Sequence, residues 1–257
     1  MGQLTENQLK LFNLLHQSRL DDLKTFKKKS YRGVWSSIID KYPESAHFIY
    51  ELLQNADDAG ATEVYIVLKS DRLLFKHNGS RHFDVTDENA EQVGDINSIT
   101  GIGDSSKTEE QNKIGKFGVG FKAVFQYTDV PEIYDDNFKF KIENYIVPTL
   151  LSNDHPDRKK GETLFVFPFK HKEKSYKEIW ERLQNLQSPI LFLRCLKKIV
   201  WREDGNGGKV GVEMEYKKEL IEKQVHKDII FERYILTTPL KRNTIFLFSQ
   251  TVSLVNE

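Results

Sequence analysis

The sequence is poor in the features that mark secreted, membrane and zinc-binding proteins. Its one cysteine, Cys195, cannot form an internal disulfide, and the apolar residues around it favour a buried thiol over a nucleophile. No run of about 18 apolar residues is present, and the N-terminus does not have the pattern of a signal peptide. The His residues and the one Cys show no zinc-ligand spacing. We therefore expect a soluble, cytoplasmic protein without a membrane partner.

The chain also lacks a net charge, because 38 Lys and Arg balance 38 Asp and Glu. No global field indicates nucleic acid as a partner, although this balance leaves local patches open. What the chain does have is a large share of aromatic residues, 17 Phe and 10 Tyr in 257 residues, which supports a core and argues against disorder. The length suits one large domain or two smaller ones.

One polar flank on a predicted helix is the first candidate for a functional site. Residues 48–60 have apolar residues at helical spacing and end at Gly60, where a helix can stop in the left-handed conformation. Glu51 and Asn55 are four residues apart and therefore share a face, which Asp58 continues one turn later. The flank suits a site in which Glu51 activates a water and Asn55 holds a cation. An ordinary amphipathic helix with a polar side is the alternative.

Two predicted strands and a long polar stretch follow this helix. Residues 62–68 and 73–78 have the composition of paired strands, and the second ends in the turn signal Asn78-Gly79. Residues 80–112 are mostly polar, with a predicted helix at 86–93. We expect residues 94–114 to form a mobile lid over a site, since long polar loops often have this role.

Three glycines then occur in the order Gly-x-x-Gly-x-Gly, at Gly115, Gly118 and Gly120. They open a predicted helix, where backbone N–H groups can approach phosphate oxygens. The spacing differs from Rossmann and P-loop patterns, and a tight structural turn is the alternative reading.

The rest of the chain predicts more strands and one helix. The predicted strands cover 133–142, 163–168, 199–202, 210–216, 229–237 and 244–249, the helix covers 175–186, and 153–160 is a polar surface loop. A boundary near 170 divides the chain into a first domain, 1–170, and a segment, 171–257, that starts a second α/β domain of a longer protein.

Taken in order, these motifs resemble the GHKL ATPase superfamily of gyrase, heat-shock chaperones, histidine kinases and MutL. The run Glu51 to Ala59 and the run Gly103 to Lys107 are most similar to its sacsin-like branch, over residues 30–170. The resemblance implies an α+β fold, a two-layer sandwich of helices on a mixed β-sheet. It implies ATP or ADP and Mg²⁺ as ligands.

The resemblance also assigns roles by position. Glu51 would orient or deprotonate the attacking water, Asn55 would hold Mg²⁺, and Asp58 would lie near the nucleoside. Thr163 would help to bind the adenine edge, and Lys107 would add charge to the phosphates. The residues that would wrap the phosphates are Gly115, Phe117, Gly118, Val119, Gly120 and Phe121.

The adenine motif departs from the family pattern Asp-x-Gly. Here the strand ends in His77-Asn78-Gly79, and the second glycine of the motif is missing. Asn78 offers both an acceptor and a donor to the base, while His77 occupies the place of the family's Asp. The sequence leaves open which of the two reads the adenine.

The leading hypothesis is an ATPase domain that binds Mg-ATP, hydrolyses it slowly and drives conformational change in a larger chaperone-like or defence-related protein. The alternative is a nucleotide-dependent scaffold module without meaningful hydrolysis. A histidine kinase would need a helical hairpin with a phosphoacceptor His, which is not apparent around His16. The expected partners are an adenine nucleotide, an unidentified protein client or downstream domains, and a second copy in a nucleotide-dependent dimer.

Overall fold

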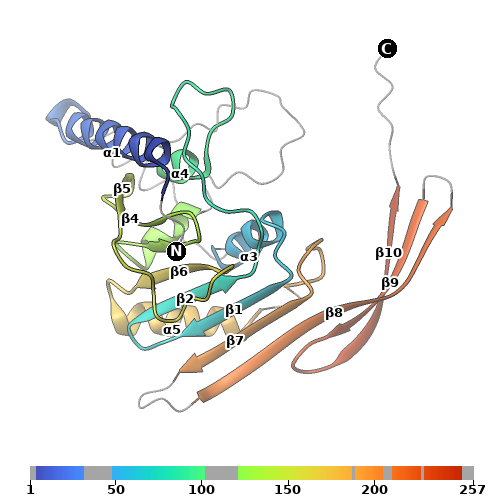
Figure 1. Cartoon of the computed structure of the whole chain (residues 1–257). Coiled ribbons are helices and arrows are strands. Elements are labelled where there is room, and N and C mark those ends of the chain that lie inside the picture. Colours follow the sequence, from blue (N-terminus) through green and yellow to red (C-terminus); the bar gives the residue numbers. More distant parts are fainter. Residues whose placement is uncertain are drawn as a thin grey trace.

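The structure, a computed structural model, describes residues 4–31, 48–101, 121–186, 189–204, 210–226 and 229–250. Figure 1 shows the arrangement of the elements in space. The helices are α1 (Glu6–Phe26), η1 (Lys29–Tyr31), α3 (Phe48–Asp58), α4 (Asp95–Thr100), η2 (Phe121–Gln126) and α5 (Lys172–Gln184). The strands are β1 (Glu63–Leu68), β2 (Arg72–His77), β3 (Glu132–Tyr134), β4 (Lys139–Glu143), β5 (Val147–Leu150), β6 (Thr163–Pro168), β7 (Lys198–Asp204), β8 (Val210–His226), β9 (Ile229–Thr237) and β10 (Arg242–Gln250).

The described strands form one mixed sheet in the order β10-β9-β8-β7-β1-β2-β6-β3-β4-β5. β1 and β7 pair in parallel, and the other described pairs are antiparallel. β2 lies between β1 and β6, with His77 at its end directly opposite Thr163 at the start of β6. The ends of β2 and the starts of β1, β6 and β7 therefore share one end of the sheet.

The helices cover one face of this sheet. Alternate β1 residues, Val64, Ile66 and Leu68, belong to one large apolar cluster together with side chains from α1, α3, α4 and α5. A separate small cluster on the opposite face contains Leu74 and Leu164. Burying each large apolar side chain contributes roughly 1.5–3 kcal/mol, so the helix-covered face supplies most of the stability. The prediction of an α+β protein with helices on a mixed sheet is confirmed at this level.

Two local predictions are wrong. Residues 86–93 form no helix, because six of them, Asp87, Glu88, Asn89, Glu91, Gln92 and Val93, are exposed and leave no apolar face to bury. The strand predicted at 133–142 is a hairpin of β3 and β4. Its turn forms because the Asp135 carboxylate accepts a hydrogen bond of 2.7 Å from the Asn137 backbone N–H, a local bond that competes with an extended strand.

The predicted domain boundary at 170 falls between β6 and α5. Beyond it, β7 pairs with β1, and Trp180 of α5 meets Trp201 of β7 edge to face within the main core. The strands β8, β9 and β10 then extend away from the helices (Figure 1). The division into two domains stays a prediction. Cys195, expected to be buried, is exposed because it lies in the loop before β7.

Candidate functional site

Helix α3 has a buried flank and an open flank. Phe48, Ile49, Leu52, Leu53 and Ala56 are buried in the core, whereas Glu51, Asn55 and Asp58 are partly exposed. The helix ends as the sequence predicts, since Gly60 has a φ of +74°, which L-residues with a side chain rarely adopt. Burial and the neighbouring Asp57 carboxylate raise the pKa of Asp58 above its ordinary value. The open flank therefore places two carboxyl groups and an amide along one side of the helix.

Asp57, next to this flank, has a structural role that the sequence analysis missed. Its carboxylate accepts hydrogen bonds from the backbone N–H groups of Arg194, Cys195 and Leu196 at 2.8, 2.7 and 2.8 Å. Asp57 is buried, and these three bonds join α3 to the loop that leads into β7. The helical spacing could have predicted that Asp57 is buried, because Asp57 follows Leu53 by four residues and so lies on the apolar face.

The end of β2 lies directly against the end of α3. A Cβ atom on Gly79 would come within 2.8 Å of the Ala59 carbonyl oxygen and 2.9 Å of its Cβ, so only glycine fits there. The Arg81 N–H also donates to the Ala59 carbonyl at 3.2 Å. This close approach brings His77 and Asn78 to the C-terminal end of the helix that carries the open flank.

His77 is buried at this junction and neutral at physiological pH. Its Nδ1 accepts a hydrogen bond of 3.1 Å from the Gly79 backbone N–H, so the neutral ring carries its hydrogen on Nε2. Its ring lies beside those of Phe75 and Phe165. Burial, reinforced by the nearby His82, lowers the pKa of His77 to about 4. The ring therefore supplies one N–H donor at the end of β2.

Asn78 uses its side chain within the fold. The amide oxygen accepts from the backbone N–H groups of Thr62 and Glu63, both at 2.9 Å, and the amide nitrogen donates to the Thr62 hydroxyl at 2.9 Å. The amide thereby fixes the start of β1 beside the end of β2. Of the two candidates at the adenine position, His77 is the one on the helix-covered face, beside Phe75 in the main core.

Thr163 belongs to a buried polar cluster. Its hydroxyl donates to Oδ2 of Asp135 at 3.0 Å, and Nδ1 of His82 lies 2.9 Å from the same oxygen. Asp135 and Thr163 are fully buried, while His82 is partly exposed. Asp135 and His82 were not predicted from the sequence, because a polar residue in a polar segment resembles an ordinary surface residue.

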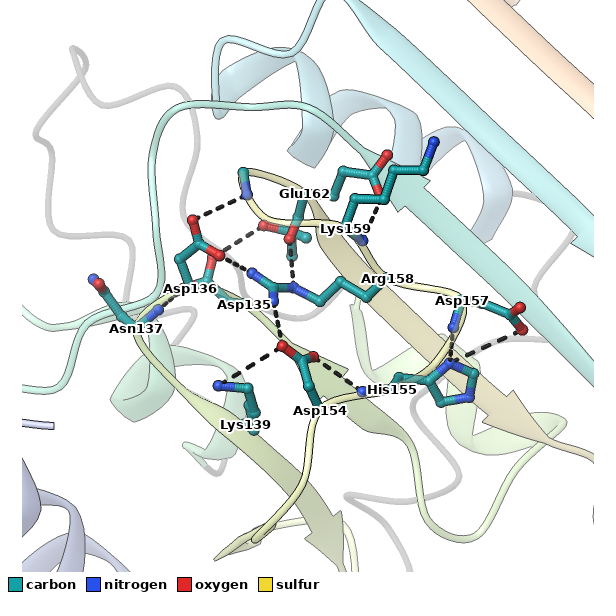
Figure 2. A network of polar contacts seen from close by, with 12 residues as sticks. Asp135, Asp136, Asn137, Lys139, Asp154, His155, Asp157, Arg158, Lys159 and Glu162 are labelled. Atoms are coloured by element: carbon teal, nitrogen blue, oxygen red, sulfur yellow. Dashed lines mark hydrogen bonds and ion pairs between the residues drawn. The ribbon is translucent and has the colours of Figure 1, made fainter. Parts of the chain in front are cut away.

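A network of ion pairs holds the turn with Asp135 in place (Figure 2). Arg158, almost completely buried, bonds Asp136, donates to Asp154 at 2.6 Å and donates to the Glu162 carbonyl at 2.7 Å. Asp136 also accepts a 3.0 Å bond from the Gly161 N–H. The loop predicted at 153–160 is therefore fastened to the β3–β4 turn through a buried arginine, and it leads directly into Thr163.

The predicted phosphate-binding residues are only partly within the described chain. Lys107, Gly115, Phe117, Gly118, Val119 and Gly120 lie outside the described residues, as does most of the predicted lid. The first part of that lid, α4, is a helix with Ile96 and Ile99 in the core. Phe121 is described, and its ring contacts Phe165 and Phe167 in the core.

Lys122, which the sequence analysis did not single out, is almost fully buried, and its Nζ donates to the Gly101 carbonyl. Burial and, to a lesser degree, Arg19 lower the pKa of Lys122 to about 8. This bond joins the start of η2 to the end of α4. Within the described ranges, no group of His, Cys, Asp and Glu side chains is arranged to hold a metal ion by itself.

A hollow of about 200 Å³ lies on the face of the sheet opposite the helices. Lys69, Lys76 and Arg202 line it. Each already has a carboxylate partner, Lys69 with Asp157 at 3.2 Å, Lys76 with Glu162 at 3.1 Å and Arg202 with Asp204 at 3.1 Å. The cations of this hollow are thus neutralised within the fold, and the end of the sheet near α3 is the better candidate site.

Comparisons with known proteins agree with the sequence motifs. Residues 28–144 match the family model described as the Sacsin domain. The chain is 30% identical to human Sacsin over 142 residues, and 32% identical to Protein NO VEIN of Arabidopsis thaliana over 121 residues. The matches take in 47% and 43% of this chain but only 3% and 4% of those relatives, so the chain spans a small part of their length.

A solved structure, the N-terminal domain of a DNA repair protein, is 14% identical with a TM-score of 0.47, covering 79% of this chain and 72% of that one. Among helices in the described part of the chain, none is long and apolar enough to cross a membrane. By the sequence matches given above, the region that carries the open flank of α3 and the end of β2 is similar to sacsin-like proteins.

Proposed function

We propose that this chain binds Mg-ATP between the open flank of α3 and the end of the sheet, and hydrolyses it slowly, as a GHKL-type domain of a larger protein. The observation that carries the proposal is the arrangement of α3. Asp57 fastens the helix to the loop before β7, while Glu51 and Asn55 stay accessible on the flank beside it. The match to the Sacsin domain over this region supports the same function.

The residues present fit the roles that such a site needs. Asn55 offers a hard oxygen ligand, the kind that Mg²⁺ prefers, and Mg²⁺ needs few protein ligands because phosphates and waters complete its shell. When bound, Mg²⁺ supplies charge neutralisation at the phosphates. Glu51 would accept a proton from the attacking water, and His77 and Thr163 would face the base. Lys107 and the glycines at 115, 118 and 120 would contact the phosphates.

Arg194 is a candidate for the cation that contacts the phosphates, because it lies close to the open flank of α3. Its backbone N–H bonds Asp57, and its charge counteracts the rise in the pKa of Asp58. We therefore prefer it to Arg202, which pairs with Asp204 beside the hollow on the opposite face. A phosphate-contacting cation supplied by another domain or a second copy is compatible with this proposal, as are chaperone-like and defence-related roles of the whole protein.

Ligand-dependent stabilisation tests the proposal. The melting temperature of the chain should rise with ATP or ADP plus Mg²⁺, and the stabilisation should be about 2.7 kcal/mol at a ligand concentration of 100 times the dissociation constant. Chelation of Mg²⁺ should reduce the shift with ATP. If no purine nucleotide at millimolar concentration changes the melting temperature, the result contradicts nucleotide binding. Binding without turnover, even with the neighbouring domains present, would favour the scaffold alternative.

A further inference from the structure

The Thr163 hydroxyl donates its hydrogen to the Asp135 carboxylate. Asp135 is fully buried, and its Oδ1 accepts the backbone N–H of Asn137 at 2.7 Å while its Oδ2 accepts the Thr163 hydroxyl at 3.0 Å. Both Asp135 oxygens act as acceptors in these bonds, so the Thr163 hydroxyl is the donor. The remaining lone pairs of the Thr163 oxygen can then only accept.

The surroundings keep Asp135 in this orientation. The Asn137 N–H occupies Oδ1 in the β3–β4 turn, and His82 meets Oδ2 on the other side. The next residue, Asp136, is bound by Arg158 and by the Gly161 N–H (Figure 2). Both ends of the turn are thus fastened to neighbouring segments, which prevents the carboxylate from turning away from Thr163.

A donor lies opposite this acceptor. His77 faces Thr163 across the antiparallel pair of β2 and β6, and paired residues in such ladders have Cα atoms about 4.5–5.5 Å apart. Because Nδ1 of His77 accepts from Gly79, its hydrogen is on Nε2. The end of the sheet therefore offers one donor, from His77, next to one acceptor, from Thr163.

We propose that Asp135 is a positioning residue that fixes Thr163 as a hydrogen-bond acceptor and thereby makes the base end of the site select a purine with a 6-amino group. The inference rests on the nucleotide site proposed above. Adenine satisfies both groups, since its amino group donates to Thr163 and its ring nitrogen accepts from His77. A 6-oxo purine presents an acceptor to Thr163, and two acceptors facing each other leave a buried group unpaired.

Replacing Asp135 by Asn should reverse this preference. The backbone N–H of Asn137 still requires an oxygen, so the introduced amide nitrogen would turn toward Thr163 and donate to it. The Thr163 hydroxyl is then free to donate to a ligand. We expect the ratio of ITP to ATP dissociation constants, measured by calorimetry with Mg²⁺ for the whole chain, to fall by about tenfold or more in Asp135→Asn.

Asp136→Asn is the matched control. Asp136 is the adjacent carboxylate in the same turn and bonds Arg158 and Gly161 instead of Thr163. This variant should lose some stability but keep the wild-type ratio. Thr163→Ser, which keeps the hydroxyl, should also keep the ratio, and Thr163→Val should lose most of the discrimination.

The outcomes separate this inference from the proposed function. If wild type binds ATP but the ratio is the same in folded Asp135→Asn, the positioning role is overturned and nucleotide binding stands. If Asp135→Asn does not fold, the Thr163 pair decides, and a valine variant with the wild-type ratio overturns the inference. If wild type binds neither triphosphate, both proposals fail together.

Discussion

Each flank of α3 carries an aspartate, and the two carboxylates have different environments. Asp57 and Asp58 are neighbours, yet one is buried against three backbone N–H groups and the other stays partly exposed beside Asn55. A rotation of about 100° along the helix separates the two environments. The difference shows that the direction of a carboxylate, more than its place in a motif, decides between a structural and a functional role.

The largest effect should come from the open flank. Glu51→Gln removes a carboxylate that repels a triphosphate slightly, so ATP affinity should stay the same or improve. Hydrolysis should fall by roughly 10² to 10⁴, the scale expected for the loss of a general base. Asn55→Ala should instead weaken Mg²⁺-dependent binding itself. Calorimetry together with single-turnover hydrolysis, in a chain long enough to be active, separates the two effects. Unchanged hydrolysis in Glu51→Gln would show that Glu51 is not the base.

A substitution on the buried flank of α3 should lower the free energy of unfolding. Asp57→Ala leaves the N–H groups of Arg194, Cys195 and Leu196 without their acceptor, at a cost of about 3–4 kcal/mol in the free energy of unfolding. Urea unfolding would measure this. Asp58→Ala, one residue further on, is the control and should cost less than about 1 kcal/mol. Equal losses in the two variants would remove the distinction between the flanks.

A pH titration should reveal the buried neutral ring at the end of β2. The unfolded chain protonates His77 near its ordinary pKa of 6.5, while the folded chain does so only at about 4. Between these values the unfolded state binds more protons, so stability should fall as the pH falls, by up to about 3 kcal/mol.

Asp95 acts in the opposite sense over part of this window, because burial raises its pKa to about 6, and its contribution to stability grows as the pH falls. The difference between wild type and His77→Gln isolates the histidine. The glutamine keeps an acceptor for the Gly79 N–H, and its unfolding free energy should lose less on acidification. Identical pH profiles for the two proteins would show that the pKa of His77 is the same in the folded and the unfolded chain.

The smallest effect should come from Asn78. Its amide bonds Thr62 and Glu63 at an exposed position where water can replace it, so Asn78→Ala should lower stability by about 1 kcal/mol. Discrimination between ATP and GTP should stay as in wild type. A selective loss of ATP affinity would show that Asn78 recognises the adenine base.

The sequence predicted those features that depend on short-range patterns. Apolar spacing located α3, alternation located β1, and β6 begins at Thr163 and ends at Pro168 as expected. The pattern failed at two places, both for local reasons. The residues at 86–93 have helix-forming composition without an apolar face, and the turn at Asp135 depends on a bond from its own side chain.

The site was predictable to a similar degree. The open flank of α3 follows from spacing alone, and the motif order points to Thr163. The partners of Asp57 and Thr163 could not be predicted, because Arg194 is 137 residues away from Asp57 and Asp135 is 28 residues away from Thr163. Sequence spacing predicts which side chains share a helix face, whereas pairs made between distant segments depend on the topology of the sheet.

The parallel pair of β1 and β7 also limits the order in which parts of the protein can fold during synthesis. Val64 pairs with Ile199, and Asp57 binds the loop just before β7, so both contacts join parts of the chain that are made far apart in time. During synthesis, β1 can pair with β2 at once, but α3 and β1 must wait for more than half of the chain to emerge before β7 and the loop that precedes it exist. Contacts of such long sequence separation slow folding, and until β7 arrives, the edge of β1 is open to pairing with other chains. A nascent chain that has reached only residue 170 would therefore carry the motifs of the proposed nucleotide site but lack the segment that fixes α3. At that stage this protein would most need a chaperone.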